Sequence, residues 1–432
     1  MQSTFGSCVV KLFSLFMILG IVGYSLLCLV YALPVEPMQN NVRESCEIFQ
    51  SEGSYNQLVA GQYDSQLDNF TDALMLIEAA FESDHSPMVA AVLNERPSIP
   101  TETSTIGDLH AFYCDNVNLF DTLTYGRYWH GYEVFLKPLL CIFNYGQIRS
   151  IICCVEIGLV FCAVGLLVYR KSAKYLLPLA AMWIYLNPVA LFMSLQFSNM
   201  FILTLVSFIV ILTFEKRYAL DRELWIIHFF VIGCLTSYFD FLTYPLITLG
   251  IPIAYLLSKY CFCLKDSIIS LIKNSVAWGA GYAGFWAAKW IGGSIISGTN
   301  ILTDAVKAVD NRISHVAVGG AVSFCDVVRQ NYNVNGSFIM MTLIISVVIV
   351  ICALLMKFKL EPKSITILLI GLLPLGWYAV TVNHSWIHYF FTFREFSITI
   401  FALLTFAVSV KRKDLYHHKT VTEKALTELG QK

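Results

Sequence analysis

The sequence predicts an all-α polytopic membrane protein with about ten transmembrane helices. Hydrophobic residues make up 57% of the 432-residue chain and charged residues only 14%, and the mean hydropathy is +0.64. Soluble domains are less apolar and carry more charge, so a fold exposed to water could not bury this much apolar surface. The net charge of -1 gives no reason to expect nucleic acid as a partner.

Apolar runs long enough to cross a bilayer occur throughout the chain. The first, residues 9–32, is longer than the apolar region of a signal peptide and no small-residue cleavage site follows it, so we expect a retained helix. The other nine candidates are residues 150–169, 175–194, 199–214, 223–239, 241–258, 274–294, 337–356, 364–382 and 391–410. We therefore expect residues 1–432 to form a single membrane domain.

The distribution of basic residues predicts how the chain is oriented in the membrane. If the N-terminus is cytoplasmic, 19 of the 29 Lys and Arg residues lie on the cytoplasmic side and 10 on the other. The short turns near residues 195–198, 240 and 383–390 carry no Lys or Arg. This asymmetry follows the positive-inside rule. We therefore expect both termini in the cytoplasm, with a cytoplasmic tail at residues 411–432.

Two polar segments then fall on the extracytoplasmic side, where we expect the functional site. The longer loop is residues 33–149 and the shorter is residues 299–336. The longer loop contains two stretches with apolar residues at helical spacing, residues 68–82 and 128–145, and we expect both to lie as interfacial helices on the membrane surface. Cys46 and Cys114 of this loop can pair if it faces an oxidising compartment, which the sequence leaves open.

The densest polar cluster of the long loop is Asp64-x3-Asp68-Asn69-Phe70-Thr71-Asp72. Asp68 and Asp72 are four residues apart and share one face of a helix. Two carboxylates placed in this way can share a proton, bind a divalent cation or provide a general base. The structural alternative is that either carboxylate only caps the start of the helix. The pattern alone does not separate these interpretations.

Ionisable side chains also occur in the outer halves of several predicted spans. Charges inside a bilayer are costly and usually functional. The residues concerned are Glu156, Asp240, Lys289 and Arg394. His384 and His388 precede Arg394 and are four residues apart, a spacing that suits contact with a metal or a phosphate. The lack of a third ligand nearby argues against a metal.

A further cluster in the long loop is Arg127-Tyr128-Trp129-His130-Gly131-Tyr132. Aromatic residues at a membrane interface normally act as anchors, which accounts for the three aromatic rings. Arg127 and His130 can instead contact a phosphate, and the rings can stack on a sugar or a prenyl chain. Together with Asp240 and Arg394, these residues predict a ring of acidic and basic groups at the outer membrane face.

This arrangement resembles the GT-C superfamily of polyprenyl-phosphate-sugar glycosyltransferases. The resemblance covers the architecture, with many spans and a long first external loop that holds an acidic motif and interfacial helices. The residues that support the resemblance are 68–72 in the long loop and, later in the chain, Asp240, His384, His388 and Arg394. Many members have compact DxD or ExD pairs, whereas the two carboxylates here are separated by three residues. That departure leaves the need for a metal open.

The resemblance implies transfer of a sugar from a polyprenyl-phosphate-linked donor to a glycan, lipid or protein acceptor outside the cytoplasm. Asp68 would deprotonate the acceptor hydroxyl, and Asp72 would orient it or hold a divalent cation. A lipid donor also implies a site that opens to membrane lipid. The donor would be bound by Arg127, His130, Asp240, His384, His388 and Arg394.

Two other classes of function suit a polytopic membrane protein. A transporter or flippase for a lipid-linked or anionic solute predicts charges near the bilayer midplane, broken helices and paired repeats. Here the charges favour one face and no repeat is visible. A receptor or scaffold predicts that Asp240 and Arg394 are only members of structural ion pairs. The sequence favours the glycosyltransferase over the transporter.

Overall fold

The computed structural model describes residues 5–317 and 320–412. The chain is 75% helical, and the strands of the described part form three two-stranded ribbons. This helical content confirms the predicted all-α class, and the apolar helices below are those of a membrane protein. Within the described residues, six helical segments are long and apolar enough to cross a membrane: Gly6–Tyr31, Tyr145–Tyr169, Leu195–Thr213, Phe324–Leu355, Pro362–Val380 and Tyr389–Ala407.

The other four predicted spans are also helical, but they are broken, shorter or more polar. Residues 175–194 form α8 (Leu176–Tyr185) and α9 (Pro188–Phe192), because Asn187 takes a left-handed conformation and Pro188 starts a new helix. The remaining three are α12 (Arg222–Phe239), α13 (Ile247–Tyr260) and α14 (Leu264–Ser297). The total of ten crossings therefore stays a prediction.

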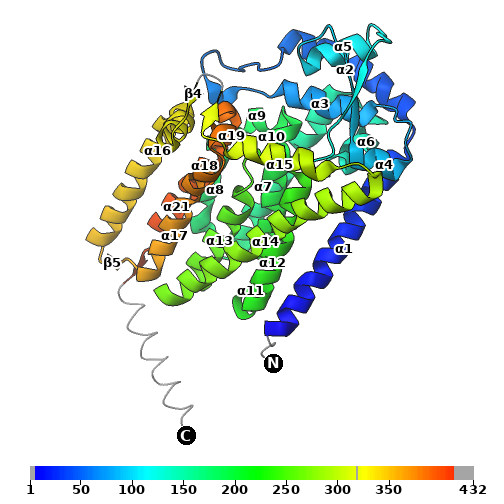
Figure 1. Ribbon diagram of the computed structural model, residues 1–432. Coiled ribbons are helices and arrows are strands. Elements are labelled where there is room, and N and C mark those ends of the chain that lie inside the picture. Colours follow the sequence, from blue (N-terminus) through cyan, green and yellow to red (C-terminus); the bar gives the residue numbers. More distant parts are fainter. Residues whose placement is uncertain (1–4, 318–319, 413–432) are drawn as a thin grey trace.

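Residues 33–144 form a layer of short helices at one end of the bundle, which we call the cap layer (Figure 1). It connects α1 (Phe5–Tyr31) to α7 (Tyr145–Tyr169). A disulfide between Cys46 and Cys114 joins its first helix to the end of α5. Its elements are α2 (Val35–Glu52), η1 (Tyr63–Ser65), α3 (Asn69–Ala80), α4 (Pro87–Leu93), β1 (Glu95–Ser98), α5 (Thr105–Tyr113), β2 (Asp121–Thr124) and α6 (Glu133–Leu140), with β1 antiparallel to β2.

Helix α3 is buried, so the prediction that residues 68–82 lie on the membrane surface is wrong. Every residue from Asp72 to Ala80 is buried, because α2, α5 and α6 enclose α3 and it contacts the start of α10 (Leu195–Thr213). Besides the apolar residues at helical spacing, Met75 and Leu76 place apolar groups on the other faces of the helix. A helix that is apolar all round is buried rather than interfacial.

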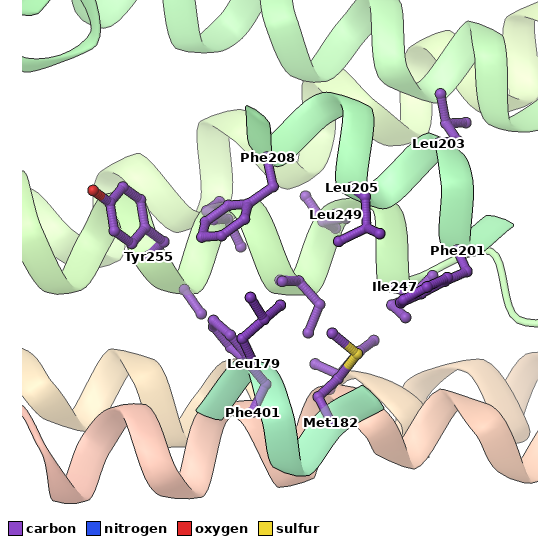
Figure 2. Packing of buried hydrophobic residues seen from close by; sticks show 14 of the residues in the cluster. Leu179, Met182, Phe201, Leu203, Leu205, Phe208, Ile247, Leu249, Tyr255 and Phe401 are labelled. Atoms are coloured by element: carbon purple, nitrogen blue, oxygen red, sulfur yellow. The ribbon is translucent and has the colours of Figure 1, made fainter. Parts of the chain in front are cut away.

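The largest hydrophobic core lies in the bundle, where α8, α10, α13 and α21 (Ser397–Ala407) meet. Figure 2 shows side chains from these four helices converging, among them Leu179, Phe208, Ile247 and Phe401. Each of these four is at most 2% exposed, so these helices form the rigid centre of the bundle.

Shorter or peripheral elements complete the fold. Two of them, α15 and α19, lie at the same end of the bundle as the cap layer (Figure 1). The bounds are η2 (Ala173–Tyr175), α11 (Glu215–Leu220), α15 (Ile301–Ile313), β3 (Val316–Ala317), β4 (Gly320–Ala321), α16 (Phe324–Leu355), β5 (Phe358–Lys359), η3 (Pro362–Ser364), α17 (Ile365–Ile370), α18 (Leu373–Val380), α19 (Val382–Ile387), α20 (Tyr389–Thr392), η4 (Phe393–Phe396) and β6 (Lys411–Arg412). Residues 413–432 of the predicted cytoplasmic tail lie outside the described residues.

Helices α12 and α14 approach each other closely through glycines. A Cβ atom at Gly233 would clash with the carbonyl oxygen of Trp278, and one at Gly281 would clash with that of Phe230. Small residues at such crossings let two backbones touch, as is common between helices in membranes. The position of α14 relative to α12 therefore depends on these two glycines.

Replacing Gly281 with Ala should lower the free energy of unfolding by about 1–3 kcal/mol, because the added methyl group meets backbone that cannot rotate away. The higher helix propensity of Ala, worth up to about 1 kcal/mol, offsets only part of this cost. The matched control is Gly279→Ala in the same helix, where nothing lies within 4 Å of the new Cβ. Denaturation of the purified protein in detergent measures the free energy of unfolding of both variants. Equal stability of the two variants would contradict the close approach.

Candidate functional site

Asp68 caps the start of α3. Its carboxylate accepts hydrogen bonds from the backbone N–H of Thr71 at 3.2 Å and from the Thr71 hydroxyl at 2.8 Å. The side chain is 1% exposed. Burial raises the pKa of Asp68 to about 7; the bonds from Thr71 and the charge of Arg394 lower it, and the charge of Asp72 raises it. Capping and proton transfer are compatible here, since a carboxyl group with a pKa near 7 exchanges a proton at neutral pH.

Asp72 is the anchor between the cap layer and the bundle. Its carboxylate accepts hydrogen bonds from the Tyr145 hydroxyl at 2.6 Å, from the Ser194 hydroxyl at 3.3 Å, and from the backbone N–H groups of Leu195 and Gln196 at 2.8 and 3.1 Å. Burial raises the pKa of Asp72 to about 6, so the group is mostly ionised at neutral pH. Four donors occupy the carboxylate. The Asp68/Asp72 pair therefore does not fit the divalent cation considered from the sequence.

Arg394 lies in η4 and is completely buried. One guanidinium nitrogen donates to the Phe390 carbonyl at 3.1 Å, and the group lies 3.9 Å above the ring of Phe197. Its charge lowers the pKa values of Asp64 and Asp68, although burial raises both on balance. Asp68 and Arg394 are buried and Asp64 is half-buried. The three residues interact through their charges, and we call them the carboxylate–arginine cluster.

Residues 53–67 pass over the segment that leads to Arg394. The ring of Tyr55 packs edge-on against Phe390 at 5.2 Å and stacks on Phe70 at 6.1 Å. Tyr63 packs against Tyr389 at 5.4 Å. This segment, which also carries Asp64, covers one side of the carboxylate–arginine cluster.

A polar cavity of about 300 Å³ lies between α15 and α19. It is lined by three cationic side chains, one carboxylate, two histidines and two asparagines. The lining residues are Arg127, Asp304, Lys307, Ala308, Asn311, Arg312, Asn383, His384, Ile387 and His388. Of the donor-binding residues predicted from the sequence, the structure brings Arg127, His384 and His388 together here.

The cations of this cavity differ in how they are engaged. Arg127 forms an ion pair with Asp304 at 3.0 Å. Arg312 donates to the Ala308 carbonyl at 2.9 Å and to the Tyr128 hydroxyl. The buried Nε atoms of both arginines have no hydrogen-bond partner in the described part of the chain.

The two histidines are uncharged at neutral pH. Burial lowers the pKa of His388 to about 4, with the charge of Arg312 acting in the same direction, and burial also lowers the pKa of His384. The Nε2 atom of His384 lies 2.7 Å from the Leu242 carbonyl oxygen. Because a carbonyl only accepts, this assigns the proton to Nε2 and leaves Nδ1 of the neutral ring as an acceptor.

His130, Asp240 and Arg394 do not line this cavity, although the sequence grouped them with the residues that do. His130 is buried within hydrogen-bond distance of the Tyr132 hydroxyl at 3.0 Å and the Tyr125 carbonyl at 2.8 Å. Asp240 accepts from the Thr243 N–H at 2.9 Å and hydroxyl at 2.6 Å, which fixes the turn between α12 and α13. Both side chains hold backbone in place.

The sequence interpretation missed the residues that α15 contributes. Asp304, Lys307, Ala308, Asn311 and Arg312 follow the spacing of one helical face, and that face lines the cavity. The other side of α15 carries an exposed apolar stripe of Leu302, Val306, Val309 and Ile313. The alternation of the two faces was a readable signal of an amphipathic helix with a basic face.

A second cavity, of about 500 Å³, is almost entirely apolar. It lies among α6, α7, α10 and α12, with Met75 of α3 at its edge. Several lining side chains are also exposed on the surface of the bundle, including Phe135, Val155 and Val206. Such a space suits a hydrocarbon chain rather than a polar group.

The described residues contain no group of three or more His, Cys, Asp or Glu side chains placed to hold a metal ion. Comparison of the chain with protein-family models, curated proteins and solved structures returns no match. Function therefore has to be argued from the geometry and chemistry of the site.

The anchor can be tested by replacing Asp72 with Asn. The amide has one acceptor oxygen in place of two, so two of the four buried donors, either Tyr145 and Leu195 or Ser194 and Gln196, lose their partner, at about 1–3 kcal/mol for each group left unsatisfied. Denaturation in detergent measures the change. Asp84→Asn, at an exposed position, is the matched control. If both variants unfold at the same denaturant concentration, the anchoring role of Asp72 is wrong.

Proposed function

We propose that the protein is a membrane glycosyltransferase that moves a sugar from a polyprenyl-phosphate-linked donor to an acceptor outside the cytoplasm. One observation carries this proposal. At the end of the bundle that bears the cap layer, a cavity lined by cations lies near a buried carboxylate, Asp68, whose pKa is about 7. The cavity is suited to an anionic leaving group, and the carboxylate of Asp68 is suited to accept the proton of a hydroxyl.

The two parts of the site are separated by a thin aromatic layer. From His388 in the cavity, the ring of Phe390 is 6.2 Å away, and Tyr55 is 5.2 Å beyond it. Tyr55 in turn lies close enough to Asp68 for the carboxylate to raise the pKa of the phenol, to which burial contributes most. Because these rings separate the cavity from Asp68, the acceptor oxygen can reach the anomeric carbon only after Tyr55 and Phe390 move out of the space between them.

The reaction assigned to this site balances as a simple displacement. Asp68 accepts the proton of the acceptor hydroxyl, and the hydroxyl oxygen forms a bond to the anomeric carbon of the sugar. The bond between that carbon and the phosphate oxygen breaks, and the phosphate leaves with the electron pair. Arg127, Lys307 and Arg312 stabilise the charge that develops on it. Arg394 is a positioning residue, since it donates to the Phe390 carbonyl, packs over Phe197 and acts on Asp68 only through its charge.

A lipid-linked donor is supported by the surroundings of the polar cavity. The exposed apolar stripe of α15, Leu302, Val306, Val309 and Ile313, suits a helix that lies in the membrane interface. Ile387, at the edge of the cavity, is 43% exposed and continues this apolar surface. A prenyl chain can thus remain in lipid while its phosphate enters the cavity.

One feature points to the alternative of a transporter or flippase: the break between α8 and α9, since broken helices often form transporter sites. The side chain of Asn187 at this break accepts from the Ala190 N–H at 3.3 Å and caps α9. The break lines neither of the two cavities described above. Because Asn187 only caps a helix and the break lines neither cavity, the enzyme is favoured over the transporter.

The proposed orientation places the cap layer outside the cytoplasm. The disulfide between Cys46 and Cys114 supports this, because disulfides persist in oxidising compartments. The start of α1 lies at the opposite end of the bundle (Figure 1), where the positive-inside rule predicts the cytoplasm.

Thiol labelling tests the orientation at two exposed positions, Lys171 and Glu102. Cys263 and Cys325, the exposed free cysteines outside the predicted spans, are first replaced by Ser. Single Lys171→Cys and Glu102→Cys variants are then treated with a membrane-impermeant reagent. We expect Glu102→Cys to react in intact cells and Lys171→Cys only after permeabilisation. Reaction of Lys171→Cys in intact cells would invert the orientation.

Replacing Asp68 with Asn keeps the shape of the side chain and an acceptor for Thr71 but removes the base. Transfer of labelled sugar from a polyprenyl-phosphate donor by the purified protein should fall by about 10² to 10⁴, with donor binding largely kept. In the unmodified protein, transfer should rise as the pH increases through about 7, because only the ionised form of Asp68 accepts a proton.

The pH profile separates a base from a helix cap. Arg394→Gln removes a charge that lowers the pKa of Asp68, so the rise in transfer should move to higher pH. Asp84→Asn serves as the control for both variants. A wild-type transfer rate in Asp68→Asn would show that Asp68 only caps α3. Movement of labelled lipid between leaflets, without cleavage of the sugar–phosphate bond, would favour the flippase.

A further inference from the structure

We propose that the cavity between α15 and α19 binds a diphosphate, so that the sugar donor is linked to its lipid through two phosphates rather than one. This rests on the proposed function and deepens it by naming the class of donor. The cavity recognises the diphosphate through Arg127, Lys307 and Arg312.

The charge of the cavity matches two phosphates. Arg127, Lys307 and Arg312 each carry a positive charge and Asp304 carries a negative one, which leaves a net charge of two positive units. A diphosphate esterified at both ends carries two negative charges at neutral pH, whereas a phosphate diester carries one. With a single phosphate, one cation of the half-enclosed cavity keeps no counter-charge.

The cations reach the cavity from two parts of the chain. Lys307 and Arg312 are five residues apart on α15, which corresponds to about 7.5 Å along the helix axis. Arg127 comes from the cap layer and pairs with Asp304 near the start of α15. Three cationic side chains suit the four unesterified oxygens of a diphosphate diester better than the two of a phosphate diester.

The size of the cavity and its neutral groups indicate how the rest of the donor is placed. A volume of about 300 Å³ is at the small end of ligand sites, so it suits a head group whose chain stays outside. The apolar stripe of α15 offers the chain a place in the membrane interface. Nδ1 of His384 is an acceptor, which suits a sugar hydroxyl rather than a phosphate oxygen.

The test compares two diesters that share a citronellyl chain and a methyl cap and differ by one phosphate unit. One is a P1-citronellyl-P2-methyl diphosphate and the other a citronellyl methyl phosphate. Direct binding to the full chain in lipid nanodiscs should show a preference of at least about tenfold for the diphosphate. Lys307→Ala and Arg312→Ala should each reduce diphosphate binding by about tenfold and shrink the preference, since each removes one charge-assisted contact. Arg329→Ala, an exposed cation of α16 outside the cavity, should change neither.

Equal affinity for the two diesters, or a preference unchanged in both Lys307→Ala and Arg312→Ala, would overturn the inference. Equal binding of dimethyl diphosphate, which lacks the prenyl chain, would overturn the lipid source of the anion. Transfer assays with matched donors distinguish the two proposals. Efficient transfer only from the monophosphate donor defeats the diphosphate but keeps the enzyme, whereas tight diphosphate binding without transfer from either donor supports the binding site and defeats the proposed reaction.

Discussion

The arrangement of the site depends on the carboxylate of Asp72, which caps a helix that belongs to another part of the chain. Ser194 occupies the position before α10, but its side chain does not cap that helix. Instead its hydroxyl donates to Asp72, which also accepts from the N–H groups of Leu195 and Gln196. A carboxylate at a helix N-terminus also interacts favourably with the helix dipole. The cap layer is thereby fixed to the bundle at a buried, fully bonded charge, and Asp68, one turn earlier on α3, is fixed with it.

This anchor accounts for the separation of charge around the site. Asp68 and Arg394 are both buried, so burial raises the pKa of Asp68, while the hydrogen bonds from Thr71 and the charge of Arg394 lower it. Asp304 and Lys307 of the polar cavity are exposed, so an anion can reach the cavity from outside. Phe390 and Tyr55 lie between the two regions, and their apolar rings keep water away from the buried charges. A buried base, Asp68, and an anion site that is open to solvent can therefore lie next to each other.

Much of the bundle was predictable because apolar runs and helical periods are local properties of the sequence. Every predicted span corresponds to helical structure, but the number of crossings does not follow from apolarity alone. The burial of α3 was not predictable from its spacing, because its enclosure depends on α2, α5 and the start of α10. The acceptor role of Asp72 likewise depends on Ser194 and Leu195, more than a hundred residues away.

The grouping of the site residues failed where the chain turns. His388 and Arg394 are six residues apart, and the sequence interpretation placed both on one phosphate. Short helices α19 and α20 and the 3-10 helix η4 follow one another here, so the direction of the side chains changes between them. His388 faces the polar cavity, whereas Arg394 faces the carboxylates. By contrast, the cavity-lining residues of α15 lie in one uninterrupted helix, where the spacings Lys307–Asn311 and Ala308–Arg312 do predict neighbouring positions, so this face was readable from the sequence.

The burial of Asp68 also constrains how an acceptor can reach it. A base sealed at 1% exposure cannot contact a hydroxyl unless some neighbouring group moves. Of the groups around it, Tyr55 and Tyr63 belong to a segment without a regular helix over most of its length, and their rings are 47% and 43% exposed. Segments with few buried contacts open at low cost, whereas α3 and its anchor at Asp72 do not. Under the proposed function, access to the base is therefore governed by residues 53–63, none of which is buried, while its position is governed by α3.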